Sequence, residues 1–336
     1  MIDPAAIRQG DRLALSRALS AVENNTPESK ALQSALFPHT GNAHLIGVTG
    51  APGSGKSTLV NQVAKSFRGS QKNGPKIAII AVDPTSPFSG GALLGDRIRM
   101  QDLFGDQGIF IRSMASRGAL GGLAHSTAAF ATILDGAGFD IIIIETVGAG
   151  QAEVDIARLA HTVIVVEAPG MGDDIQAIKA GILEIADILV INKADKPEAK
   201  NTARALRVML EMAKGAGSMP TAGKHFRSSS VVKKSESQGS TQGSTWETPI
   251  RLVTATEGKG VQTLIEDIRN HKNYLKNADL WKVKEAHRLE KDLEALVKDK
   301  LMDQWKENLD QDFYQQILAE IIQRECSPIE ALDRLL

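Results

Sequence analysis

The segment from Gly50 to Ser57 reads Gly-Ala-Pro-Gly-Ser-Gly-Lys-Ser and constrains the fold more than any other feature of this chain. It follows the apolar run 45–48 and precedes a helix-like stretch that starts at Thr58. A glycine-rich turn between a strand and a helix directs backbone N–H groups inward, and the helix N-terminus adds unpaired donors and a positive dipole end. The sequence therefore predicts a phosphate-binding loop within an α/β domain.

The side chains of this loop fit a magnesium-bound polyphosphate. Lys56 supplies a positive charge for the β- and γ-phosphates, and the hydroxyl of Ser57 is a ligand for Mg²⁺. The expected nucleotide-binding residues here are Gly53, Ser54, Gly55, Lys56, Ser57 and Thr58. The alternative is a glycine-rich connection that binds nothing.

The composition is that of a globular protein. The chain has 336 residues, 42% of them hydrophobic and 24% charged, so it is long enough for one large domain or two small ones. A formal net charge of −1 gives no reason to expect nucleic acid or an acidic membrane as a partner. The single cysteine, Cys326, excludes an internal disulfide and a cysteine metal cluster. With no secretory signal at the start and no apolar run of membrane-spanning length, we expect a cytoplasmic protein.

Short apolar runs alternate with helix-like stretches between residues 44 and 254. The runs are 45–48, 77–82, 109–111, 141–144, 163–166, 188–191 and 252–253. Most are continuous, as expected for strands that are buried on both faces. We therefore predict a doubly wound, mostly parallel sheet with helices on both sides. Ligands of such sheets bind beyond the carboxyl ends of the strands.

The pattern divides the chain into three parts. Residues 1–42 form a helical segment, 43–274 the α/β domain and 275–336 a helical arm, in which Ser327 and Glu330 form a capping box. Within the domain, residues 215–247 are rich in serine and glycine and are expected to form a flexible surface insert. The arm packs on the core of its own chain or holds a second subunit.

A guanine-binding sequence follows the expected strand 188–191. It reads Asn192-Lys193-Ala194-Asp195. The Asp195 carboxylate can accept hydrogen bonds from N1–H and the exocyclic amine of guanine, which adenine does not offer at those positions. Asn192 can brace neighbouring loops, and the Lys193 stem can cover the base. A solvated turn is the alternative interpretation.

Acidic residues follow two other expected strands. Glu145 ends the strand 141–144, and Gly148 can present its N–H to a γ-phosphate. Asp83 ends the strand 77–82, and Asp96 lies before a helix-like stretch, so both are candidate Mg²⁺ partners. The alternatives are helix capping by Glu145 or Asp96. Gln151 is a further candidate, for orienting an attacking water.

Taken together, these segments resemble the MeaB/ArgK (MMAA-type) GTPases. The resemblance covers roughly residues 8–275 and rests on segments 10–18, 50–57, 83–100, 112–124, 145–151, 168–179 and 192–195. It implies a P-loop NTPase of the SIMIBI class that binds GTP, GDP and Mg²⁺. It also implies a chaperone for an adenosylcobalamin-dependent acyl-CoA mutase, typically methylmalonyl-CoA mutase, and a homodimer joined through a C-terminal helical dimerisation arm.

The resemblance also assigns roles to individual positions. It implies a catalytic role for Lys56, Asp83, Asp96 and Glu145. It places four residues in the Mg²⁺ region: Ser57, Asp83, Asp96 and Glu145. Segments 83–102, 145–155 and 168–180 match switch segments, the last of which carries Gln176 and Lys179.

Two features depart from the family pattern. The 215–247 insert is long, and the loop that closes on guanine reads Thr254-Ala255-Thr256 in place of Ser-Ala. A backbone N–H of that loop can still serve the guanine O6. Three other functions stay open: a metallochaperone GTPase, a kinase associated with basic amino-acid transport, and a structural partner protein that binds no nucleotide.

Overall fold

The structure is a computed structural model that describes residues 2–69, 74–83, 100–115, 122–146, 152–170, 180–215 and 245–336. The chain divides into two compact units, Met1–Arg288 and Leu289–Leu336. The predicted boundaries at 42/43 and 274/275 stay predictions. Most of the predicted insert, residues 216–244, lies outside the described residues.

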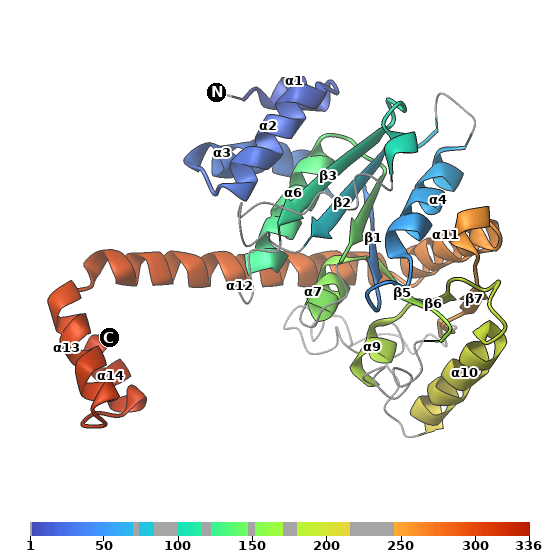
Figure 1. Cartoon of the computed structure of the whole chain (residues 1–336). Helices are drawn as coiled ribbons and strands as arrows, with labels where there is room; N and C mark the ends of the chain where they lie inside the picture. The colour runs from blue at the N-terminus through green and yellow to red at the C-terminus, as the bar shows by residue number, and fades with distance from the viewer. Residues whose placement is uncertain are drawn as a thin grey trace, which may run out of the picture. The chain divides into compact units, whose positions relative to one another are not determined.

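A seven-stranded parallel sheet forms the centre of the first unit (Figure 1). Its order is β3-β2-β4-β1-β5-β6-β7. The strands are β1 His44–Thr49, β2 Ile77–Asp83, β3 Ile109–Ala115, β4 Ile141–Glu145, β5 Thr162–Glu167, β6 Ile188–Ile191 and β7 Ile250–Leu252. The predicted doubly wound sheet is confirmed, with every described strand pair parallel. The last strand starts and ends earlier than the predicted run 252–253.

The continuous apolar runs become buried strands because helices cover both faces. Every residue of β1, β4, β5 and β6 is buried. On one face, alternate strand residues pack with α4 Lys56–Arg68 and α11 Val261–Asn277. The other face packs with α6 Gly122–Gly136, α7 Ala152–Leu159, α9 Ala180–Ile185 and α10 Ala199–Gly215. Figure 1 shows α4 and α11 together on one side of the sheet.

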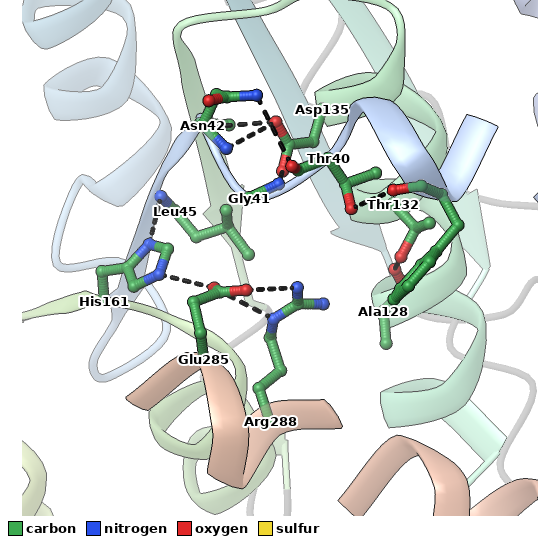
Figure 2. Close-up of polar contacts among 12 residues, drawn as sticks. Thr40, Gly41, Asn42, Leu45, Ala128, Thr132, Asp135, His161, Glu285 and Arg288 are labelled. Carbon is green, nitrogen blue, oxygen red and sulfur yellow. Dashed lines mark hydrogen bonds and ion pairs between the residues drawn. The ribbon is translucent and has the colours of Figure 1, made fainter. Parts of the chain in front are cut away.

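Three N-terminal helices extend the core on the α6 side. They are α1 Pro4–Arg8, α2 Arg12–Glu23 and α3 Pro27–Leu36. Pro27 occupies the first turn of α3, and Thr26 caps that helix through a hydrogen bond from Ser29 N. The short link to β1 is held by Asp135 of α6, whose carboxylate accepts hydrogen bonds from the N–H groups of residues 41–43 (Figure 2).

The start of α12 Leu280–Asn308 is tied to the amino end of the sheet. His161, immediately before β5, accepts a hydrogen bond at Nδ1 from Leu45 N, 3.0 Å away, and its Nε2 lies 2.7 Å from Glu285 Oε1 (Figure 2). Arg288 donates to the same Glu285 carboxylate. The indole of Trp281 stacks on the His161 ring at 3.8 Å. This buried polar network joins the first turns of α12 to β1 and β5.

The second unit consists of the remainder of α12, α13 Gln311–Ile322 and α14 Pro328–Leu335. The predicted capping box at Ser327 and Glu330 is present. Ile317, Cys326 and Ala331 form its small buried core. Large apolar side chains stay exposed along its α12 segment: Leu293, Leu296, Val297, Leu301 and Met302. None of the described helices has both the length and the apolar character needed to cross a membrane.

Candidate functional site

The phosphate-binding loop connects β1 to α4 in a conformation that requires glycine. Gly50, Gly53 and Gly55 have φ angles of 137°, 76° and 88°, in the region that disfavours side chains. A Cβ at Gly50 would lie 2.0 Å from Val166 O, and one at Gly55 would lie 2.4 Å from Asn192 Nδ2. Both glycines therefore meet a steric limit in addition to the φ requirement, because the loop passes directly against β5 and Asn192.

Lys56 begins α4 and turns its side chain back into the loop. Its Nζ donates to Gly50 O at 2.9 Å and to Ala51 O at 3.0 Å, and the residue is buried. A buried ammonium group is stable only where acceptors satisfy it. The loop carbonyls supply these acceptors, which keeps the positive charge inside the ring of backbone N–H groups.

Ser57 of α4 and Glu145 of β4 meet at the carboxyl end of the sheet. The Ser57 hydroxyl donates to Glu145 Oε1 at 2.6 Å, and Glu145 is only 3% exposed. Next to them, Thr146 Oγ1 donates to Thr49 Oγ1 at 2.9 Å. Sequence reasoning did not pair these two threonines, because only the strand register shows that the residues after β4 lie beside the end of β1.

Asp83 ends β2 at the same edge of the sheet. It is in register with Ala115 of β3, and Ala81, two residues earlier, is in register with Glu145. The backbone thus places Asp83 at the same sheet edge as Glu145, and its role as an Mg²⁺ partner stays a prediction. Asp96, Gly148, Gln151, Gln176 and Lys179 lie outside the described residues.

Asn192, which follows β6, connects two loops to each other. Its Nδ2 donates to Ser54 O at 2.9 Å and to Gly55 O at 3.3 Å. Its Oδ1 accepts from Ala255 N at 3.1 Å. The predicted bracing role is confirmed, and the structure identifies what is braced: the phosphate-binding loop and the loop after β7.

The remaining residues of the guanine-binding sequence surround this connection. Lys193 has a φ of 57° and donates from Nζ to Gly53 O at 2.7 Å. Ala194 N donates to Val253 O, and Asp195 is exposed at the same edge. The loop after β7 turns through Thr254, whose N–H donates to Lys259 O. Thr254 and Ala255 are buried, whereas Thr256 is exposed.

The structure brings together the predicted residues that it describes. All of them lie at the carboxyl ends of strands in one sheet: the phosphate-binding loop, Glu145, Asn192–Asp195 and Thr254–Thr256. In Figure 1, β1, β5, β6 and β7 lie next to one another, which explains why loops about 200 residues apart can share one site.

The oxygen donors at this edge fit a hard divalent cation. Mg²⁺ prefers oxygen ligands and keeps several waters. The Ser57 hydroxyl donates to Glu145, and both side chains offer oxygen atoms of the kind that such a cation prefers. Within the described residues no group of three or more His, Cys, Asp or Glu side chains is arranged around a common point.

Comparisons with known proteins identify a single family. The model of a family described as methylmalonyl-CoA mutase-associated GTPase MeaB matches residues 15–310. A putative GTPase of Pyrococcus horikoshii is 41% identical over 98% of this chain and 95% of its own length. GTPase ArgK of Escherichia coli is 42% identical over 62% of each chain. A crystal structure titled LAO/AO transport system kinase is 26% identical, with a TM-score of 0.65 over 99% of this chain and 94% of that one.

Proposed function

The chain belongs to the MeaB family of GTPases, and from this premise we propose that its GTPase cycle assists an adenosylcobalamin-dependent acyl-CoA mutase, specifically methylmalonyl-CoA mutase. The chain itself is a P-loop GTPase that binds guanine nucleotides. The observation that carries the proposal is the match to a mutase-associated family over residues 15–310. Cofactor loading and protection of the mutase from inactivation are the roles that we assign to the cycle.

The described residues divide the work of nucleotide binding. The loop N–H groups and Lys56 bind the phosphates, and Asp195 selects guanine through its N1–H and amine. Asn192 holds the phosphate-binding loop against Ala255, so the two ends of the nucleotide site keep a constant separation. When a triphosphate enters, its oxygens replace the loop carbonyls as acceptors for Lys56, which stabilises charge on the γ-phosphate during attack by water.

We propose Ser57, Glu145, Asp83 and Asp96 as the residues around Mg²⁺. The cation neutralises charge on the β- and γ-phosphates when it is bound. The hydrogen bond between Ser57 and Glu145 orients the hydroxyl oxygen toward that position from the protein side.

The catalytic part of the proposal is tested with nucleotides and one pair of variants. Lys56→Ala should lower the GTP hydrolysis rate by about 100-fold or more, because a preorganised charge at the γ-phosphate is lost. Lys65→Ala is the matched control, since Lys65 lies on the same helix in an ion pair with Asp102. Preferential ATP binding by the wild type, or full activity of Lys56→Ala, contradicts the proposed site.

The partner is tested by affinity capture and by reconstitution. The protein loaded with GDP or with a non-hydrolysable GTP analogue is used to capture proteins from its native host. Methylmalonyl-CoA mutase should be retained in a nucleotide-dependent manner, and transfer of adenosylcobalamin to the apo-mutase should depend on hydrolysis. A mutase that neither binds nor responds to the protein in either nucleotide state refutes this role.

One finding favours a second function. The solved structure that aligns over 99% of this chain is titled a transport system kinase. A kinase would transfer the labelled γ-phosphate of the nucleotide to a protein. A GTPase releases that label as inorganic phosphate only, so a single labelling experiment separates the two.

We also propose that the chain forms a homodimer through its C-terminal arm, residues 275–336. The support is the row of exposed apolar side chains on α12, where Leu293 and Leu301 are 62% and 60% exposed. Residues eight apart lie on one helix face, and an apolar face of this kind favours burial against a partner.

Analytical ultracentrifugation tests this assembly. Leu293→Asp combined with Leu301→Asp should convert dimer to monomer, because two charges would have to be desolvated at the interface. Lys298→Asp, on the same helix, is the control for added charge. A wild-type monomer at micromolar concentration contradicts the proposal.

A further inference from the structure

A cavity lies at the amino end of the sheet, away from the nucleotide site. Its volume is about 430 Å³. It is lined by His44, Phe67, Gly74, Pro75, Asp140, Ile141, Arg269 and Lys272. His44 and Ile141 are the first residues of β1 and β4, whereas the phosphate-binding loop follows the last residue of β1. The cavity therefore shares no residue with the nucleotide site.

Two cations from one helix line this cavity. Arg269 and Lys272 are three residues apart on α11 and so lie on one helix face. The Arg269 guanidinium lies 5.7 Å from the centre of the Phe67 ring, and Lys272 Nζ lies 5.7 Å from that of Trp281. Neither makes a hydrogen bond or close ion pair with any residue in the described part of the chain.

One carboxylate, that of Asp140, also lines the cavity and interacts electrostatically with Lys272. Asp140 Oδ2 accepts a hydrogen bond from Lys76 N at 2.8 Å. With two cations and one carboxylate, the lining carries an excess of one positive charge. Burial and the neighbouring Lys276 lower the pKa of Lys272, whereas the Asp140 carboxylate raises it.

A buried histidine supplies a third polar group. It begins a chain of polar contacts. His44 Nε2 lies 2.8 Å from Thr162 Oγ1, and Thr162 Oγ1 lies 2.9 Å from His271 Nδ1. The other ring nitrogen, His271 Nε2, lies 3.3 Å from Asp187 Oδ1. We place a proton on His271 Nε2, because this atom faces the Asp187 carboxylate. His271 Nδ1 then accepts a hydrogen bond from the Thr162 hydroxyl. The Thr162 oxygen in turn accepts one from His44 Nε2–H. Nδ1 of His44 then carries a lone pair, and it makes no hydrogen bond within the described residues.

We propose that this cavity binds a small organic anion whose carboxylate or phosphate group contacts Arg269 and Lys272. The apolar part of the ligand packs against Phe67 and Ile141, which line the same cavity. His44 Nδ1 accepts a hydrogen bond from a hydroxyl of the ligand. The volume falls within the usual range for small-molecule sites, about 300 to 1,000 Å³. Carboxylates and phosphates share the anionic oxygens that these cations recognise.

Calorimetric titration of the full chain tests the site. The protein is first saturated with Mg²⁺ and a non-hydrolysable GTP analogue, so that the phosphate-binding loop is occupied. Inorganic phosphate and succinate are then titrated separately, which distinguishes the two chemistries. We expect at least one probe to bind in the millimolar range or tighter.

Paired variants assign any binding to the cavity. Arg269→Gln combined with Lys272→Gln should weaken binding by tenfold or more while leaving GTP hydrolysis unchanged. Lys276→Gln removes a positive charge one turn further along α11, over Trp281 but outside the lining, and should weaken binding much less than the double variant does. The proposal is overturned if neither probe binds at millimolar concentration, if the double variant binds as the wild type does, or if Lys276→Gln weakens binding equally.

Discussion

At the scale of single residues, Asn192 has the most consequential contacts in the nucleotide site. Its side-chain Nδ2 donates hydrogen bonds to the carbonyl oxygens of Ser54 and Gly55. Its Oδ1 accepts one from the N–H of Ala255. The side chain is buried, so water cannot replace these bonds. One residue after β6 therefore sets the distance between the phosphate-binding loop and the loop after β7.

Replacing Asn192 by alanine should destabilise the protein and weaken nucleotide binding together. Loss of the amide leaves buried partners such as Ala255 N unsatisfied, which costs about 1 to 3 kcal/mol. Urea unfolding measures the stability, and titration with a fluorescent GDP analogue measures the affinity. The exposed Asn201 of α10 is the control, and its alanine variant should behave as the wild type. Full nucleotide affinity in Asn192→Ala would show that the connection between the loops is dispensable.

At the scale of elements, the strand–loop–helix unit from His44 to Arg68 depends on where its glycines lie. Gly50 has a φ of 137° and would place a Cβ 2.0 Å from Val166 O, which is backbone of β5. Backbone atoms of a central strand cannot move aside without disturbing the sheet. Gly41, before β1, also has a positive φ, of 91°, but nothing lies within 4 Å of its Cβ position.

These two glycines give a matched pair of alanine variants. Both substitutions impose left-handed strain of about 1 to 2 kcal/mol, and only Gly50→Ala also displaces the phosphate-binding loop. We expect Gly41→Ala to retain nucleotide affinity and Gly50→Ala to lose at least tenfold, measured by titration with GDP. Equal affinities in the two variants would indicate that the loop tolerates displacement.

At the scale of the whole unit Met1–Arg288, the two ends of the sheet differ in character. The carboxyl end presents loops to a ligand, whereas the amino end contains a buried polar network with three histidines. Burial is the main cause that lowers the pKa values of His44 and His161. Burial raises the pKa of Glu285, but hydrogen bonds from His161 and Arg288 and their charges lower it to about 2.

This network makes the stability of the unit depend on pH. His161 accepts from Leu45 N at Nδ1, so its Nε2 carries the proton donated to Glu285, and a second proton would break the bond to Leu45. The unfolded chain binds protons at histidines near pH 6.5, whereas the folded state resists them. The unfolding free energy should therefore fall as the pH decreases below about 6.5, by up to about 1.4 kcal/mol per pH unit for each histidine.

Urea unfolding between pH 8 and pH 5, followed by circular dichroism, measures this slope. His161→Gln should be less stable at pH 8 and show a shallower slope, whereas His39→Gln, at an exposed position, should keep the wild-type slope. Below pH 4.5 the stabilising contribution of Glu285 is lost in turn, as the pH falls toward its folded pKa of about 2. A flat profile from pH 8 to pH 5 would contradict the assignment of neutral, buried histidines.

Much of this architecture was predictable because local patterns carry it. Continuous apolar runs predict buried parallel strands; six of the runs lie within strands of the sheet, and the seventh, 252–253, overlaps β7 only at Leu252. Phosphate binding is predicted by the positions of glycine, lysine and serine in residues 50–57. Guanine binding is predicted by Asp195 in the sequence Asn192–Asp195. Both predictions are possible because few residue types perform that chemistry.

Other features follow only from the tertiary structure, because they depend on strand order and register. Nothing local indicates that Thr49 meets Thr146, that Asn192 reaches Ala255, or that His44 lies in one hydrogen-bonded chain with His271. Those contacts join segments about 60 to 230 residues apart, and strand register alone decides which side chains meet. Local periodicity thus determined the elements and the kind of ligand, while the packing of the sheet decided how the loops are held and created the cavity at its opposite end.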